Sequence, residues 1–310
     1  MHNRLKGWIG GRARESIGVY WGRLGICLVH QSPDAKPVAV FLPSGKDIES
    51  TLWDEAVVKL EALSGVKRVQ MAFAIALDAD DVFVKTITVP EGLDERQLEQ
   101  VAIVEAISNL PVPPEEICLD FIRGNSDGRD EMVGIAFCRR ERIDEILACA
   151  EEINIPVHVV DRDVQAIHDA IAERSLSEDR EIKYPYAIVL TEVSPRIIIC
   201  LEPTEFEVYP IRMQSNDVEE RSASLLTQLG NCWTRCRMSR ANIAEFLEQV
   251  LIIGDMVPMS NWSSVGSEVS VSKKIGNLLI GQSVERVSAN DYVPDEIVLI
   301  ALGMSDRRLT

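Results

Sequence analysis

Gly22 and Gly25, near the start of the chain, are spaced as in a turn that could bind an anion. The stretch SIGVYWGRLGICLVH, residues 16–30, predicts two strands joined by a tight turn from Gly22 to Gly25. Because glycine has no side chain, such a turn lets backbone N–H groups approach an anion such as phosphate. The same turn can also merely connect two strands. The residues alone leave both interpretations open.

Two further groups of polar residues invite a test. The stretch DADD, residues 78–81, is acidic, but a hard cation needs several converging oxygen ligands and no partner acid follows nearby, so we expect a solvated loop. His168 and Asp169 are neighbours on a predicted helix, where adjacent positions do not face each other, so we expect an exposed helix face there. The sequence has no Gly-x-Ser-x-Gly, Walker or His-Glu-x-x-His motif. It therefore predicts no catalytic residue and no metal site.

Composition disfavours several classes of protein. The 310 residues carry 32 Lys and Arg against 49 Asp and Glu, a net charge of −17 that argues against a nucleic-acid surface. Hydrophobic residues make up 46%, enough for a sizeable core, and the length suits two domains. Seven cysteines without regular spacing favour a reducing compartment. No apolar run approaches the ~20 residues that span a bilayer and no targeting segment is evident, so we expect a cytoplasmic protein.

Hydrophobic periodicity predicts the same order of elements twice, with consecutive strands first and helices afterwards. Residues 68–77 form a near-continuous apolar run, which is typical of a strand covered on both faces, whereas 81–89 alternate as a half-exposed strand. Asp94 can cap a helix that must end at the prolines of PVPP. We expect strands at 16–21, 24–30, 37–42, 186–191, 196–202 and 206–211, and helices at 94–110, 140–152, 162–175, 218–237 and 294–305.

The polar stretch SLSEDREIKYP reads as a linker between two α/β domains. We therefore divide the chain into a basic N-terminal arm over 1–15, a first domain over 16–180 and a second domain over 181–310. The second domain closes with the helix at about 294–305.

Residues 86–121 carry a more specific pattern. The stretch TITVPEGLDERQLEQVAIVEAISNLPVPPEEICLDF combines a strand ending in Val-Pro, an acidic amphipathic helix with a Glu-Ala pair, a proline-rich turn and a strand ending in Leu-Asp-Phe. This pattern resembles the PilM family, actin-like proteins of bacterial type IV pilus, DNA-uptake and secretion systems. The segments MVGIAFCRRERIDEILACAEEINIPVHVVDRDVQAIHDAI, IIGD and IALGMSDR resemble later parts of the family. The resemblance implies an α/β protein with the actin-like ATPase fold, two ribonuclease-H-like domains and a small α/β insert at about 81–156 in the first.

The resemblance also implies a place for a nucleotide, and this sequence departs from the family there. Nucleotide-binding members resemble Ile-Gly-Val-Asp-Ile-Gly in the first hairpin, where this chain has Tyr20 instead of the acid. A second Asp-x-Gly hairpin has become Leu190 and Glu192. The acids would hold a metal–water shell, and Glu192 places negative charge where phosphate would lie. We therefore expect no cofactor and no ATP hydrolysis. Should ATP and Mg²⁺ bind, the remaining contacts implied are Gly22, Gly25, Gly254 and Asp255.

Family resemblance implies a scaffold on the cytoplasmic side of an inner-membrane type IV pilus-like platform, with other platform proteins as neighbours. The partner implied is the N-terminal cytoplasmic peptide of a PilN-like single-pass membrane protein, through which membrane association would be peripheral. An extended peptide could lie between the first domain and its insert, with main-chain hydrogen bonds for affinity. The candidate walls are Val82, Val84, Ile87, Asp120 and Phe121.

Each of these assignments has an alternative. The five wall residues could simply pack within the insert. The whole chain could be an ATP-binding switch or ATPase of the same fold or, more remotely, a sugar-kinase-like enzyme.

Overall fold

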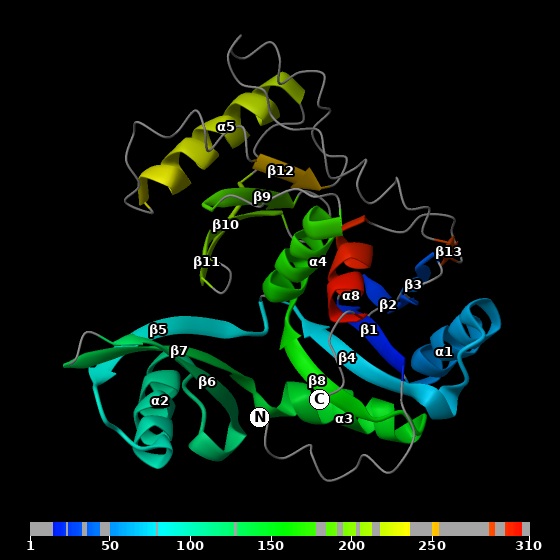
Figure 1. Ribbon diagram of the computed structural model, residues 1–310, viewed down its shortest axis with the longest axis horizontal. Coiled ribbons are helices and arrows are strands. Elements are labelled where there is room, and N and C mark those ends of the chain that lie inside the picture. Colours follow the sequence, from blue (N-terminus) through cyan, green and yellow to red (C-terminus); the bar gives the residue numbers. More distant parts are fainter. Residues whose placement is uncertain are drawn as a thin grey trace.

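The described strands form three sheets, and Figure 1 shows how helices lie between and around them. The computed structural model describes residues 15–22, 24–32, 36–43, 50–78, 80–126, 129–177, 184–190, 195–202, 205–212, 218–235, 250–253, 285–288 and 295–305.

Six strands form the largest sheet, here called the first sheet, in the order β13-β3-β2-β1-β4-β8. Their bounds are β1 Glu15–Gly22, β2 Gly25–His30, β3 Val38–Pro43, β4 Met71–Leu77, β8 Val157–Arg162 and β13 Glu285–Ser288. β1 and β2 are antiparallel with Gly22 opposite Gly25, which confirms the predicted hairpin. β1, β4 and β8 run parallel, so their carboxyl ends meet at one edge of the sheet.

Helices cover both faces of the first sheet. Successive side chains of a strand point to opposite faces, and here both faces are apolar. α1, Ser50–Ser64, and α3, Arg140–Glu152, pack on one face. α4, Asp163–Ser177, and α8, Asp295–Ser305, pack on the other. β4 is buried along its whole length, as predicted for a strand covered on both faces.

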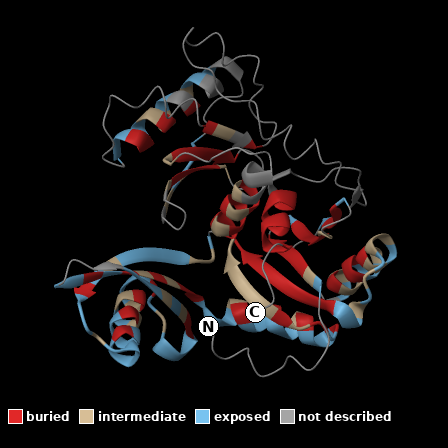
Figure 2. Ribbon diagram, in the orientation of Figure 1, coloured by how far each residue is buried: buried red, intermediate tan, exposed pale blue. Residues whose placement is uncertain are grey.

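Small residues let α8 lie very close to its neighbours. A side chain at Gly18 of β1 would overlap the backbone of Ala301 in α8. A side chain at Gly303 of α8 would likewise overlap the backbone of Ala166 in α4. Residues 297–305 are all buried, as the uniform colour of α8 in Figure 2 shows. α8 is therefore part of the core of the first sheet.

The second sheet repeats the layout of the first. β9, β10 and β11 form an antiparallel meander, and β12 runs parallel to β9 as β4 runs parallel to β1. α5, Val218–Arg235, packs on one face. The opposite face shares one apolar cluster with α4 and α8, so these two helices lie between the sheets (Figure 1). The bounds are β9 Tyr186–Leu190, β10 Arg196–Glu202, β11 Glu205–Pro210 and β12 Val250–Ile253.

The third sheet, here called the insert sheet, is antiparallel with the order β5-β7-β6. α2, Glu95–Asn109, covers one of its faces. The Asp94 carboxylate accepts a hydrogen bond of 2.8 Å from the Gln97 backbone N–H and caps α2 as predicted. The remaining bounds are β5 Phe83–Pro90, β6 Ile117–Ser126, β7 Asp130–Arg139 and the 3₁₀ helices η1 Arg68–Gln70 and η2 Pro114–Glu116.

Packing does not follow the order of the chain. α3 lies within the segment 81–156 predicted as an insert, yet it packs on the first sheet. α8 lies within the segment 181–310, yet it also packs on the first sheet. The division of the chain into domains remains a prediction. Of the residues considered above, the arm before Glu15, Glu192, Gly254 and Asp255 lie outside the described residues.

Candidate functional site

The turn between β1 and β2 is filled by a side chain of the protein. Tyr20 is 1% exposed, and its ring folds over the turn so that a side chain at Gly22 would overlap the Tyr20 hydroxyl and Cζ. Gly22 therefore makes room for the tyrosine. Gly25 has φ of 141°, a backbone conformation that favours glycine because it lacks Cβ. Both glycines have a structural reason that does not require a phosphate group.

At the second hairpin, Leu190 ends β9 and is fully buried in the apolar cluster between the two sheets. It lies where the family resemblance would place an acid. A leucine in this position stabilises the packing of the second sheet against α4 and α8 and offers no metal ligand.

The carboxyl edge of the first sheet carries a buried group of charges that sequence reasoning missed. Asp78 follows β4, and Asp163 begins α4 directly after β8. Arg196, the first residue of β10, donates from Nη2 to Asp163 Oδ2 at 2.5 Å, and its Nη1 lies 3.8 Å from Asp78 Oδ1. The side chains are 4%, 1% and 13% exposed for Arg196, Asp163 and Asp78. The sequence carried one signal of this buried ion pair, an arginine directly before the apolar residues of the run RIIIC.

The expectation of an exposed helix face at His168 was wrong. His168 is buried, because α4 is covered by the first sheet on one side and by the second sheet on the other. Its Nε2 lies 2.8 Å from the Tyr184 hydroxyl and its Nδ1 lies 3.1 Å from Asp169 Oδ1. Burial raises the pKa of Tyr184. The Phe206 ring of β11 packs edge-on against the imidazole at 5.2 Å.

A pocket of about 370 Å³ lies between the insert sheet and α3, beside the loop that follows β4. Arg142 of α3 organises it: the guanidinium lies 3.1 Å from Asp81 and 3.2 Å from Glu145, and stacks over the Trp21 ring at 4.2 Å. Acidic side chains outnumber basic ones in the lining, and two apolar side chains complete it. The lining residues are Asp80, Asp81, Phe83, Leu110, Arg139, Glu141, Arg142 and Glu145.

The structure places four of the five predicted wall residues on two opposite faces of the insert sheet. Val84, 49% exposed, lies on the face of the insert sheet away from α2, in one row with Ala136 and Asp120. Ile87 and Phe121 pack on the opposite face, beneath α2.

Val82 packs against the core between α1, α3 and the first sheet. It stands between Asp81 and Phe83, which line the pocket. None of the five predicted wall residues lines the pocket itself, and their role in binding stays a prediction.

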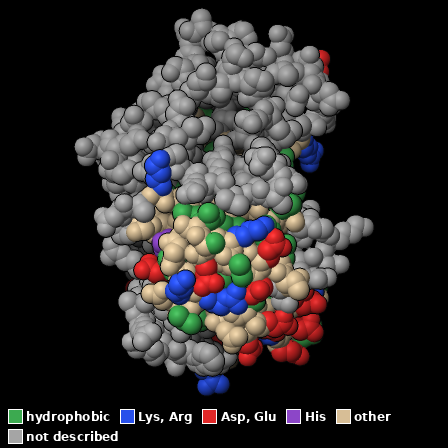
Figure 3. All heavy atoms as spheres, turned by 90° about the vertical axis from the view of Figure 1, so that its right-hand side faces the viewer, with side chains coloured by type: hydrophobic (Ala, Val, Ile, Leu, Met, Phe, Trp, Pro, Cys, Tyr) green, Lys and Arg blue, Asp and Glu red, His purple; other side chains and the backbone are tan. Residues whose placement is uncertain are grey.

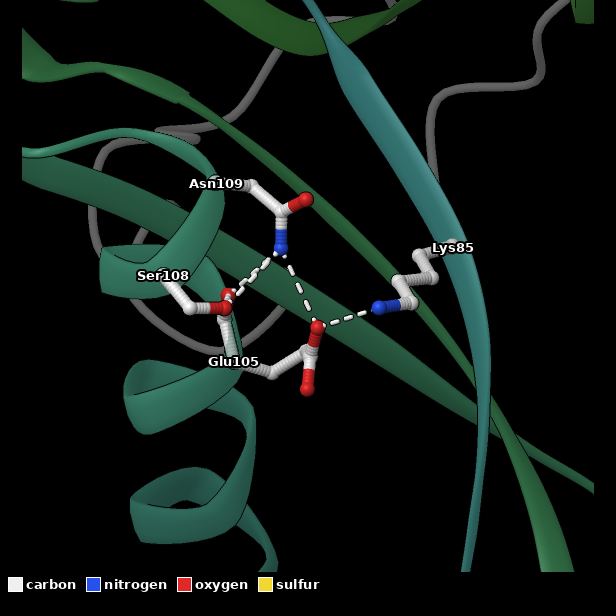
Figure 4. A network of polar contacts seen from close by, with 4 residues as sticks. All are labelled: Lys85, Glu105, Ser108 and Asn109. Carbon is white, nitrogen blue, oxygen red and sulfur yellow. Dashed lines mark hydrogen bonds and ion pairs between the residues drawn. The ribbon is translucent and has the colours of Figure 1, made fainter.

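β5 is an edge strand that is paired only with β7 among the described strands. Lys85 of β5 donates to the Glu105 carboxylate of α2, and Asn109 donates to the same oxygen at 3.1 Å (Figure 4). The hydrogen bonds from Lys85 and then Asn109 lower the pKa of Glu105. This polar network holds β5 against α2, and Phe83 at the start of β5 lines the pocket.

The surface over α1 has a different character. Lys59 lies 2.7 Å from Glu55, and Arg68 lies 2.8 Å from Asp54. Lys and Arg side chains therefore stand beside Asp and Glu side chains on this side of the molecule (Figure 3). Such neutralised pairs are ordinary solvated surface, so this face is a weaker candidate for a binding site than the pocket.

The duplicated meander, the helices between two sheets and the insert sheet together define an actin-like fold. Two solved structures share it at full length. A PilM–PilN type IV pilus biogenesis complex matches with a TM-score of 0.53 at 15% identity, over 95% of this chain and 98% of that chain. The cytoplasmic domain of EpsL, an inner membrane component of the type II secretion system of Vibrio cholerae, matches with a TM-score of 0.52 at 13% identity, over 94% of each chain.

Residues 47–197 match the family model described as type IV pilus assembly protein PilM. The matched range includes β4, β8, α4 and the whole insert sheet. This segment is therefore similar to the PilM family, as the pattern at 86–121 indicated.

Proposed function

We propose that this protein is a non-enzymatic scaffold on the cytoplasmic side of an inner-membrane type IV pilus-like platform. The match of residues 47–197 to the PilM family model supports this role. The filled turn at Tyr20 and the buried Leu190 support the absence of ATP hydrolysis, because a metal-bound nucleotide needs acidic ligands and an open phosphate cradle. No cofactor is part of the proposal.

The proposed partner is the N-terminal cytoplasmic peptide of a PilN-like single-pass membrane protein. The observation that carries this proposal is the pocket beside an edge strand. An extended peptide can add to the open edge of β5 while one of its side chains enters the pocket. The association of a related fold with PilN in the matched complex is in keeping with this partner. Membrane association then follows from the partner's own anchor, and other platform proteins would assemble around the pair.

The pocket favours a basic residue in the peptide. Asp81 and Glu145 already share the charge of Arg142, while Glu141 and Asp80 line the same space. An excess of carboxylates attracts Lys or Arg, and the exposed Phe83 ring offers an apolar surface for the stem of that side chain. The chain's net charge of −17 acts in the same direction at longer range.

The test is binding of fluorescent N-terminal peptides from inner-membrane platform proteins to the purified chain. Val84→Asp at the edge strand should weaken binding by at least about tenfold, because it places a charge where a strand would add. The matched control is Val104→Asp on α2, which is 69% exposed and carries the same change of charge outside β5. Equal affinity of the Val84→Asp variant and the unaltered protein would remove β5 from the site.

Calorimetry with ATP and Mg²⁺ tests the non-enzymatic part of the proposal. We expect no heat of binding at submillimolar nucleotide. Binding in that range would favour the alternative, a nucleotide-dependent switch of the same fold, and would require Tyr20 to leave the turn.

A further inference from the structure

Asp78, Asp163 and Arg196, here called the Arg196 cluster, occupy a position where α/β proteins commonly hold a ligand. The two acids follow neighbouring parallel strands, β4 and β8, at the carboxyl edge of the first sheet. Ligands of open α/β sheets gather at this edge, because loops and helix N-termini converge there. In this protein the guanidinium of Arg196, from β10 of the second sheet, reaches this edge of the first sheet.

Burial makes the pairing of charges in the Arg196 cluster necessary, so substitution of one partner should be costly. Arg196 and Asp163 are almost completely buried, and β10 and α4 belong to the apolar cluster between the sheets. A buried charge must be paired, since it has lost its water and cannot regain it. Removing one partner leaves the other charge buried alone, whereas removing both leaves an apolar contact of similar volume.

A second set of contacts joins the same helix to the second sheet. The His168 imidazole of α4 contacts the Tyr184 hydroxyl at 2.8 Å. The guanidinium of Arg162, at the end of β8, stacks over the Phe206 ring of β11 at 4.9 Å. α4 is therefore held to the second sheet at its first residue by Arg196 and in its second turn by the contact of His168 with the Phe206 ring of β11, while Arg162 joins β8 to the same ring.

We propose that Arg196 is a built-in cation that fixes the two sheets in one arrangement without any nucleotide. In a two-state protein a ligand shifts the arrangement of domains only through a difference in affinity for the two states. Here the charge between the sheets is the Arg196 side chain, which is always present, unlike a ligand that binds and dissociates. The scaffold therefore presents one fixed surface to its partners, whatever the nucleotide concentration. This inference does not depend on the identity of the partner.

The first test measures the distance between the sheets by pulsed electron resonance. Spin labels carried on unnatural amino acids, which avoid the native cysteines, go at Val58 of α1, 51% exposed, and at the exposed Thr227 of α5. The unaltered protein should give one narrow distribution that Mg-ATP does not change. Arg196→Met should broaden or shift it, whereas the control Arg235→Met, an exposed arginine at the end of α5, should not.

Hydrogen exchange of the full chain gives an independent measure. Exchange at the start of α4 and in β10 should accelerate by about 100-fold or more in Arg196→Met, and the melting temperature should fall by roughly 6–15 °C.

The double variant Asp163→Asn with Arg196→Met keeps the proposal falsifiable if the single variant does not fold. With Arg196 and Asp163 both uncharged, the remaining charge is that of Asp78, whose side chain is 13% exposed and keeps some contact with water, so we expect most of the melting temperature to return while the distance distribution stays broad. A narrow, unaltered distribution in the folded double variant would overturn the proposal. So would a narrow distribution in the unaltered protein that moves on addition of Mg-ATP.

Discussion

Gly22→Ala tests the claim that the first hairpin is shaped by Tyr20 and not by a phosphate group. Gly22 ends the strand β1 and lies directly against the Tyr20 ring, where an added Cβ would overlap the hydroxyl and Cζ. The ring is buried among α8 and the inner residues of the sheet, so it cannot simply swing into solvent. Alanine must therefore displace the ring or the turn.

The magnitude follows from two opposing effects. At an unstrained position, Gly→Ala stabilises by about 0.4–1 kcal/mol because the unfolded chain loses freedom. Overpacking of a well-filled site costs about 1–3 kcal/mol. The overlap should dominate, so we expect the free energy of unfolding to fall by about 1–2 kcal/mol.

A double-mutant cycle with Tyr20→Leu isolates the contact. Leucine has no atoms at the positions of Cζ and the hydroxyl, so in that background Gly22→Ala should be neutral or slightly stabilising. The coupling free energy should be about 1–3 kcal/mol. The measurement is hydrogen exchange of the β1 and β2 amides in increasing urea. A neutral Gly22→Ala in the unaltered protein, or an equal cost in both backgrounds, would refute the reasoning.

Three further predictions concern the core, a thiol and a surface ion pair. Trp53→Ala should lower the free energy of unfolding by about 3–5 kcal/mol in urea melts, since the fully buried indole packs against two other aromatic rings. Burial raises the pKa of the Cys138 thiol to about 12, so stability should fall as pH rises from the ordinary thiol range toward 12, and at pH 8 a thiol reagent should label Cys138 only after unfolding. The hydrogen bond from Lys85 lowers the pKa of Glu105, so its contribution is present above the ordinary carboxyl range and is lost as pH falls through the lowered value. Lys85→Met should move the Glu105 titration in a carboxyl-detected spectrum back toward that range, and an unmoved titration would show that the pair does not form in solution.

Local patterns predicted the elements that depend on neighbouring residues. The hairpin at Gly22 and Gly25, the buried strand β4 and the cap at Asp94 all rest on contacts within a few residues or on a continuous apolar run. Such signals remain readable without tertiary structure, because turn chemistry, strand burial and helix capping are decided locally.

The missed features depend on elements far apart in the chain. Arg196 and Asp163 are 33 positions apart, and neither has a local signature of ion pairing inside a core. His168 was assigned to an exposed face because its burial depends on a sheet that begins at Tyr186. Val84 and Ile87 were predicted as walls of one groove, but they lie on opposite faces of the insert sheet, because the pattern of β5 cannot say which face α2 covers.

The placement of α8 has a consequence for folding during synthesis. β13 and α8 leave the ribosome after the other described elements, yet the strand borders β3 and the helix fills the inner face beside β1. A nascent chain that has already made residues 15–177 still exposes a wide apolar surface until those final segments emerge. Chaperone occupancy during synthesis should therefore persist until residues 285–305 have emerged, and a fragment cut near residue 180 should aggregate unless the peptide 285–305 is supplied in trans.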